Sequence, residues 1–104
     1  MHMTITARHC DISDELRARA DAVLRRLSEL ADRPVDGTIV FDVAPNAFQA
    51  EIRLHVSRGD TFVGTATEKD HRSALDRAEE KVRRQLDKTD QPGHRNRRAQ
   101  QDAV

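Results

Sequence analysis

The sequence is poor in aromatic residues, with no Trp, no Tyr and only three Phe among 104 residues. Proteins that bind single-stranded nucleic acid stack bases on aromatic rings, so a stacking platform is poorly supplied here. The formal net charge is zero, because 18 basic residues balance 18 acidic ones. A general nucleic-acid binder is expected to be clearly basic, so that function would require the cations to be segregated on the surface.

Cysteine is also scarce, since Cys10 is the only one. A single cysteine excludes an internal disulfide and fits a reducing compartment. No apolar run approaches the length of a transmembrane helix, and the N-terminus lacks the apolar core of a signal peptide. We therefore expect a soluble, cytoplasmic protein that does not associate with membranes.

Residues that could carry catalysis are scattered along the chain. The five histidines have no spacing typical of a catalytic triad or a metal site, and there is no Gly-rich phosphate loop. His9, Cys10 and Asp11 form the one local cluster of ligand types, whereas a metal site needs three or four converging ligands. Cys10 is better explained as a small packed residue than as a nucleophile. The sequence therefore predicts no enzyme activity, no cofactor, no metal and no small-molecule substrate.

Alternation of apolar and polar residues predicts four strands. They cover residues 1–8, 38–44, 48–56 and 61–67. The third is the clearest, because every second residue from Phe48 to Val56 is apolar and the residues between are polar or charged. One face of that strand is expected to be buried and the other to face water.

Helical periodicity predicts two helices. Ser13 is a plausible N-cap for the first, which runs to about Ala31, and residues 32–37 then form a turn. The second helix covers residues 69–88 and contains no Gly or Pro. Its apolar residues fall on one narrow stripe. They are Leu75, Ala78, Val82 and Leu86.

The second helix also sorts its charges by position. Four cations step by four, three and four residues, which places them on a stripe roughly opposite the apolar one. We call this stripe the basic ridge, and it consists of Arg77, Lys81, Arg84 and Lys88. Charge runs are usually solvated faces. A line of four cations also suits the phosphates of a nucleic-acid backbone.

The element order predicts an α+β fold, β-α-β-β-β-α. The three consecutive strands should form an antiparallel meander, and the first strand should pair parallel to a neighbour. Each helix has one apolar stripe, so both should cover the same face of a four-stranded mixed sheet. We expect residues 1–88 to form one domain and the polar residues 89–104 to form a disordered tail.

Two stretches carry a family resemblance. The first is Ile12-Ser13 with Leu16-Arg17, and the second is Asp70, Ala74-Leu75-Asp76, Lys81, Arg84-Gln85-Leu86 and Lys88. With the element order, they resemble the bacterial ribosome hibernation-promoting factor family, which includes the ribosome-associated inhibitor proteins. The resemblance covers roughly Met3 to Lys88, and the chain looks like a short form, without the dimerising domain of long members. It departs from the family at Arg72, where a Tyr is usual.

The resemblance implies a translation inhibitor that binds the small ribosomal subunit in stationary or stressed cells. There it would occupy the mRNA/tRNA channel, with basic helical residues contacting rRNA phosphates. Carried over by position, the rRNA-binding residues are Arg8, Arg26, Arg77, Lys81, Arg84 and Lys88.

Two other interpretations stay open. A sheet with two helices on one face also suits a general double-stranded RNA-binding module, which would bind naked duplex RNA. A protein-interaction adaptor that uses the sheet edge would instead hold a protein partner in a manner insensitive to ribonuclease.

Overall fold

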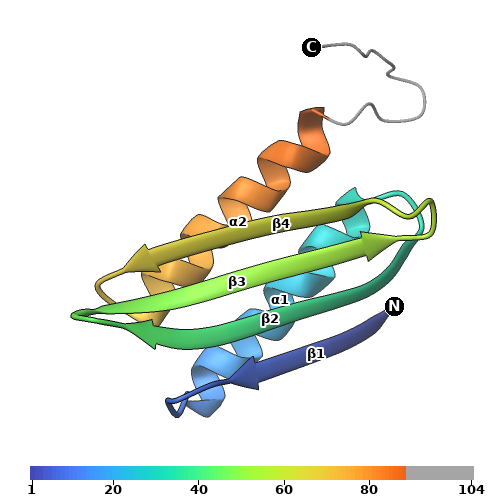
Figure 1. Cartoon of the computed structure of the whole chain (residues 1–104). Coiled ribbons are helices and arrows are strands. Elements are labelled where there is room, and N and C mark those ends of the chain that lie inside the picture. Colours follow the sequence, from blue (N-terminus) through green and yellow to red (C-terminus); the bar gives the residue numbers. More distant parts are fainter. Residues whose placement is uncertain (89–104) are drawn as a thin grey trace.

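The computed structural model describes residues 1–88 and places the strands side by side in chain order, β1-β2-β3-β4 (Figure 1). The elements are β1 (His2–Ala7), α1 (Asp14–Leu30), β2 (Pro34–Ala44), β3 (Ala47–Val56), β4 (Thr61–Glu68) and α2 (His71–Lys88). This confirms the predicted β-α-β-β-β-α order and the α+β class. The tail predicted for residues 89–104 lies outside the described residues.

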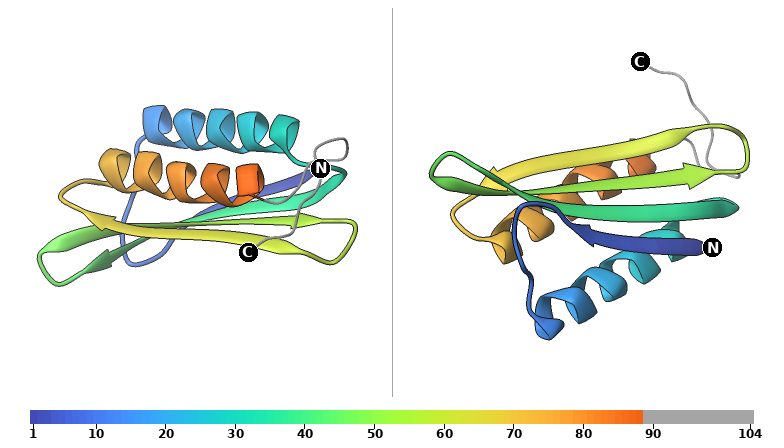
Figure 2. Two further views of the ribbon diagram at one scale, coloured as in Figure 1. Left: turned by 90° about the horizontal axis from the view of Figure 1, so that it is seen from above. Right: turned by 60° about the horizontal axis from the view of Figure 1, so that its bottom comes forward.

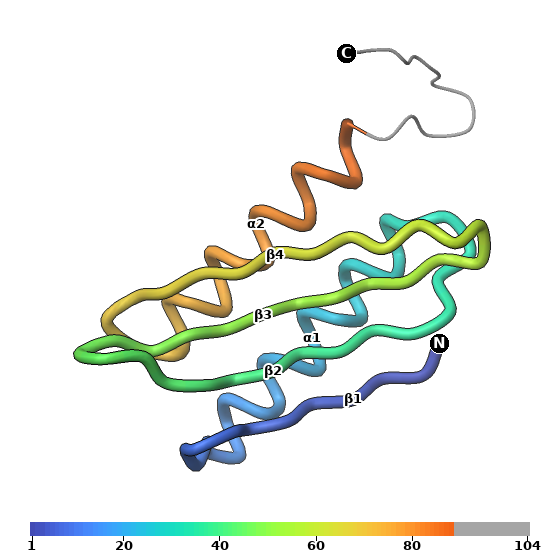
Figure 3. Tube along the Cα trace, in the orientation of Figure 1, coloured from blue at the N-terminus to red at the C-terminus, as the bar shows by residue number. Residues whose placement is uncertain are grey.

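The sheet is mixed, as predicted. Strand β1 pairs parallel with β2, whereas β2, β3 and β4 form an antiparallel meander joined by tight turns (Figure 3). The register places Ile39 of β2 opposite Ile52 of β3, and Ile52 opposite Gly64 of β4. Apolar positions of neighbouring strands therefore line up across one face of the sheet.

Both helices pack on that same face of the sheet (Figure 2). Within residues 1–88 no helix covers the opposite face of the sheet. Ile52 and Leu54 are fully buried while Arg53, between them, is exposed, which confirms the predicted alternation of β3. The helices contribute Leu24 and Leu27 from α1 and the predicted apolar stripe from α2. The core is thus one layer between the sheet and the helices.

The prediction of a turn over residues 32–37 is wrong, because β2 begins at Pro34. Pro34 is the first residue of the strand, a position where its missing N–H is tolerated. The register shifts between Pro34 and Asp36, and this irregularity interrupts the alternation that would mark a strand in the sequence. Gly37 then fits beneath α1, since a Cβ there would lie 3.0 Å from Leu24 Cδ2.

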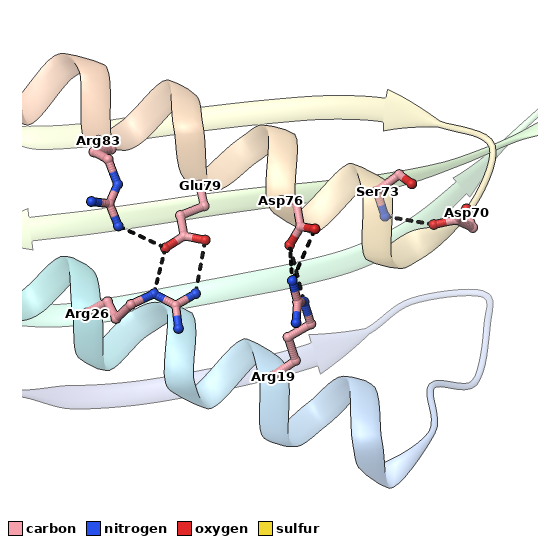
Figure 4. Close-up of polar contacts among 7 residues, drawn as sticks. All are labelled: Arg19, Arg26, Asp70, Ser73, Asp76, Glu79 and Arg83. Atoms are coloured by element: carbon pink, nitrogen blue, oxygen red, sulfur yellow. Dashed lines mark hydrogen bonds and ion pairs between the residues drawn. The ribbon is translucent and has the colours of Figure 1, made fainter.

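Side-chain caps set where the helices begin. The Ser13 hydroxyl accepts a 3.0 Å hydrogen bond from the Leu16 amide, which confirms Ser13 as the N-cap of α1. Helix α2 begins at His71, two residues later than predicted, because the Asp70 carboxylate caps it by accepting a 2.7 Å bond from the Ser73 amide (Figure 4). That hydrogen bond lowers the pKa of the Asp70 carboxyl.

Gly64 lets α2 approach the edge strand β4 closely. A Cβ at this position would lie only 2.5 Å from the backbone oxygen of Ala78 and 3.0 Å from a methyl of Val82. Ala78 is itself small and fully buried, so the contact is nearly backbone to backbone. The position of α2 on the sheet therefore depends on the absence of a side chain at residue 64.

We expect Gly64→Ala to lower the free energy of unfolding by about 1–3 kcal/mol, the usual cost of overpacking a well-packed core. Urea denaturation followed by circular dichroism measures this change. Thr65→Ala is the matched control, because Thr65 is exposed on the same strand. A loss below about 0.5 kcal/mol in Gly64→Ala, the range of surface substitutions, would contradict the close approach.

Candidate nucleic-acid interface

The basic ridge lies on the surface of α2. Arg77, Lys81, Arg84 and Lys88 are all exposed. The four residues of the apolar stripe are all buried. The charge sorting read from the helical spacing is therefore present in three dimensions.

The ridge runs along the outer edge of β4. The Lys81 ammonium donates a 2.7 Å hydrogen bond to the Thr65 carbonyl oxygen. One turn on, the Gln85 amide donates to the Val63 carbonyl at 2.6 Å and accepts from the Val63 amide at 3.1 Å. Side chains of α2 thus satisfy backbone groups that an edge strand would otherwise offer to a passing strand. This part of the sheet edge is closed to the strand pairing that an adaptor would use.

Two shallow depressions lie beside the ridge. One, of about 300 Å³, is bounded by residues 66–68 of β4 and by Arg77, Lys81 and Arg84. The other, of about 290 Å³, is bounded by Lys81, Arg84, Gln85 and Lys88. Each depression gathers cations from successive turns of the helix around one concave spot, which suits a bound phosphate group.

The four ridge cations differ in how far they are neutralised. Arg77 lies within 3.8 Å of Glu68 and 3.5 Å of Glu80, so acids on both sides offset its charge. Within residues 1–88, Arg84 and Lys88 have no ion-pair partner within 4 Å. The acids that pair with the ridge therefore lie at its N-terminal end, around Arg77.

Arg8 and Arg26, the other two predicted rRNA-binding residues, lie away from the ridge. Arg8 follows β1 and pairs with Asp42 at 3.2 Å, and its side chain remains exposed. Arg26 lies on α1 and grips Glu79 of α2 with two hydrogen bonds of 3.0 and 3.1 Å. The structure brings four of the six predicted residues together and separates the other two.

Charged residues also join the two helices, and the periodicity of each helix taken separately does not reveal them. Arg19 of α1 donates three hydrogen bonds of 2.9–3.2 Å to Asp76 of α2. Farther along, Glu79 accepts from Arg26 and also lies 3.4 Å from Arg83. We call this set the interhelical seam, and Figure 4 shows its residues, Arg19, Arg26, Asp76, Glu79 and Arg83.

One signal in the sequence does point to the seam. Glu79 follows Leu75 by four residues and precedes Val82 by three, so it borders the apolar stripe. A carboxylate so close to the core needs a cationic partner, because an unpaired buried charge is costly. The sequence does not say that the partner comes from the other helix.

His9, Cys10 and His71 have structural contacts. The His9 ring lies 3.2 Å from Asp42, and the His71 ring lies 2.9 Å from the Asp42 carbonyl, between Phe41 and Phe48. Cys10 packs against the core, and burial, together with the charge of Asp42, raises the pKa of its thiol. A raised pKa keeps the thiol protonated and unreactive.

Residues 1–88 offer neither a metal site nor a membrane span. No group of three or more His, Cys, Asp or Glu in this part of the chain could hold a metal ion. Neither helix described here is long and apolar enough to cross a membrane.

Comparison with known proteins gives a match over nearly the whole described chain. The family model described as "Sigma 54 modulation protein / S30EA ribosomal protein" matches residues 3–91. A curated protein of Haemophilus influenzae, named ribosome-associated factor Y, is 29% identical over 88 residues. These make up 85% of this chain and 81% of the relative.

Solved structures agree with this match. A ribosomal subunit interface protein from Coxiella burnetii superposes with a TM-score of 0.76 and 25% identity, over 85% of this chain and 96% of that one. The N-terminal domain of Protein Y from Thermus thermophilus gives a TM-score of 0.71 and 24% identity, over 83% of this chain and 96% of that one. At 24% identity, the likeness to the Thermus thermophilus domain shows a shared fold and no more.

Proposed function

Because the chain belongs to the Sigma 54 modulation protein / S30EA ribosomal protein family, that of the ribosome hibernation-promoting factors, we propose that it binds the ribosome and inhibits translation. Its target is the small subunit, where it occupies the mRNA/tRNA channel in stationary or stressed cells. The members of this family are binding proteins and not enzymes, and the same holds for this chain.

The basic ridge is the observation that carries this proposal. Four exposed cations follow one line on a helix whose other face is buried, although the whole chain has no net charge. Such a line suits the phosphate backbone of rRNA, which is read through charge and shape and not through base edges. The names of two relatives, a ribosome-associated factor and a ribosomal subunit interface protein, support a ribosomal partner.

The proposed action is steric. A folded domain held by its helices in the channel excludes mRNA and tRNA without any chemical step, so its inhibition depends on affinity and concentration. Contacts with phosphates also make the affinity fall as salt rises, since each contact releases counterions from the RNA. A protein that binds ribosomes acts where ribosomes lie, so the proposal implies a cytoplasmic location.

Sedimentation with purified ribosomal subunits tests the proposal. We expect the protein to pellet with small subunits and not with large ones. We also expect it not to bind small subunits that already hold mRNA and tRNA, because these ligands would occupy the same channel. Equal pelleting with both subunits, or simultaneous binding with mRNA and tRNA, would contradict channel occupancy.

Two controls separate the other interpretations. Binding to naked duplex RNA as tight as to the subunit would favour a general double-stranded RNA-binding module. A partner that stays bound after ribonuclease treatment would favour a protein adaptor.

A further inference from the structure

Glu79 is a charged residue in an unusual place. It is 9% exposed and is the one charged residue among residues 1–88 that is buried with the core. It lies on α2 where that helix faces α1. Its two carboxylate oxygens accept one hydrogen bond each from the Arg26 guanidinium, at 3.0 and 3.1 Å. A second guanidinium, that of Arg83, lies 3.4 Å from the same oxygen that Arg26 Nε contacts.

The charges in this group do not cancel. One carboxylate faces two guanidiniums, so Arg26, Glu79 and Arg83 together carry one net positive charge. The side chains of Arg26 and Arg83 remain 48% and 45% exposed, whereas that of Glu79 is 12% exposed. The acid is therefore on the inside and the two cations are on the outside. N–H groups of both guanidiniums that do not contact Glu79 are left for a ligand.

The carboxylate also fixes the geometry of the pair. Two parallel hydrogen bonds from Arg26 to Glu79 fix the plane of the Arg26 guanidinium before any ligand binds. An arginine without such a partner would lose rotamer freedom on binding, which would weaken the binding. Arginine is charged at any physiological pH, and hydrogen bonding to Glu79 raises the pKa of Arg26 further. A preorganised pair of guanidiniums matches the planar, bidentate recognition of a phosphate group.

We propose that Glu79 positions Arg26 and Arg83 as a second phosphate-binding site, at the interhelical seam, for a phosphodiester of an RNA backbone. The identity of this ligand rests on the proposed function. The site lies on the side of α2 that faces α1, opposite the side where the basic ridge follows β4. Helix α2 then has cations on both flanks.

Acidic side chains lie on the exposed face of α2 between the basic ridge and the interhelical seam. They repel a phosphate backbone less than the sequence alone suggests. Asp76 is gripped by Arg19 through hydrogen bonds as short as 2.9 Å, and Glu80 lies 3.5 Å from Arg77. Each of these two acids is thus offset by an arginine, whereas Asp87, farther along the same line, is exposed and has no ion-pair partner within residues 1–88. An RNA backbone can therefore lie across α2 at Asp76 and Glu80 and contact both flanks there.

Binding to purified small subunits as a function of salt tests the site. We expect Arg83→Ala to weaken binding about tenfold, the lower scale for losing a charge-assisted hydrogen bond, and to flatten the salt slope by about one unit. The matched control is Arg25→Ala, which removes the same charge from an exposed arginine paired within α1 to Asp21 at 2.7 Å. Equal affinities and slopes for the two variants would overturn the proposal.

Glu79→Gln separates positioning from simple charge. This variant gains one positive charge, so charge alone predicts tighter binding to rRNA. The proposal predicts weaker binding, because the two guanidiniums lose the carboxylate that orients them. A melting curve establishes that the variant is folded, and the same or tighter binding by a folded Glu79→Gln protein would overturn the positioning role. If that variant does not fold, Arg83→Ala still tests whether the seam binds a phosphate, because it leaves Glu79 and Arg26 in place.

A ribosome-free measurement distinguishes failure of this inference from failure of the proposed function. Inorganic phosphate is titrated into the free protein while NMR follows the Nε–H signals of its arginines. We expect the signals of Arg26 and Arg83 to shift in wild type, and the Arg26 signal to stay unmoved in Arg83→Ala. Wild-type protein that binds small subunits but shows no such shift would overturn the seam site alone. Protein that shows the shift but binds no subunit would overturn the proposed function and leave the anion site standing.

Discussion

Replacing Ile52 by Ala is expected to lower the free energy of unfolding by about 2–5 kcal/mol. Ile52 is fully buried at the centre of the sheet, opposite Ile39 on one side and Gly64 on the other. Truncation removes apolar area from the core and leaves a cavity, because the neighbouring strands hold the backbone in place. Urea denaturation at constant pH measures the loss.

The matched control for this variant is Arg53→Ala. Arg53 is the next residue on β3, lies on the open face and contacts Glu51 at 2.7 Å. We expect the control to change stability by no more than about 0.5 kcal/mol, as for other surface substitutions. A loss of that small size in Ile52→Ala would contradict the placement of this side chain in the core.

A variant with all four ridge cations replaced by Ala is expected to bind small subunits at least about 100-fold more weakly than wild type. Removing one cation from its phosphate should cost about 1–3 kcal/mol. Because acids already offset Arg77, the loss of the other three contacts sets the lower bound, about 3 kcal/mol or roughly a factor of 100. The salt slope should also flatten by about one unit for each phosphate that is no longer neutralised. Fluorescence anisotropy at several salt concentrations measures both quantities.

The ridge variant should remain folded. Its four side chains lie opposite the buried stripe, and Ala is the best helix former. Lys81 donates a 2.7 Å bond to the Thr65 carbonyl, and Arg77 lies within 4 Å of Glu68 and Glu80, so a small drop in melting temperature is expected from these two residues. A melting curve recorded beside the binding data shows whether weaker binding reflects unfolding.

A second quadruple variant controls for net charge. It replaces four exposed arginines that lie off the ridge and off the seam: Arg17, Arg25, Arg53 and Arg58. This protein has the same net charge as the ridge variant, so equal loss of affinity in the two would show a general charge effect. Asp76→Ala is unsuitable as an acidic control, because Asp76 binds Arg19 across the helices.

The features that could be predicted from the sequence are those set by local periodicity. The buried stripe of α2 and the exposed ridge both follow from 100° per residue, and the alternation from Phe48 to Val56 follows from the pleat of a strand. Ser13 could be identified as a cap because its hydroxyl bonds to an amide three residues away. Each of these depends on neighbours in the chain, which the sequence displays directly.

The features that could not be predicted depend on residues far apart in the chain. Arg26 and Glu79 are 53 residues apart, and Val63 and Gln85 are 22 apart, so no local pattern pairs them. The early start of β2 could not be predicted for a related reason: Pro34 usually signals a turn, and only its partner Val56 makes it part of a strand. Tertiary contacts decided these positions over local preference.

The proposed function requires this chain to lie in the mRNA/tRNA channel of the small subunit with the ridge of α2 on rRNA. A cryo-electron microscopy map of the wild-type protein bound to purified small subunits tests it most directly. We predict density for the domain in the mRNA/tRNA channel, with Arg84 and Lys88 within hydrogen-bonding distance of rRNA phosphates. Density outside the channel, or in the channel with the open face of the sheet on the rRNA and α2 facing solvent, would contradict it.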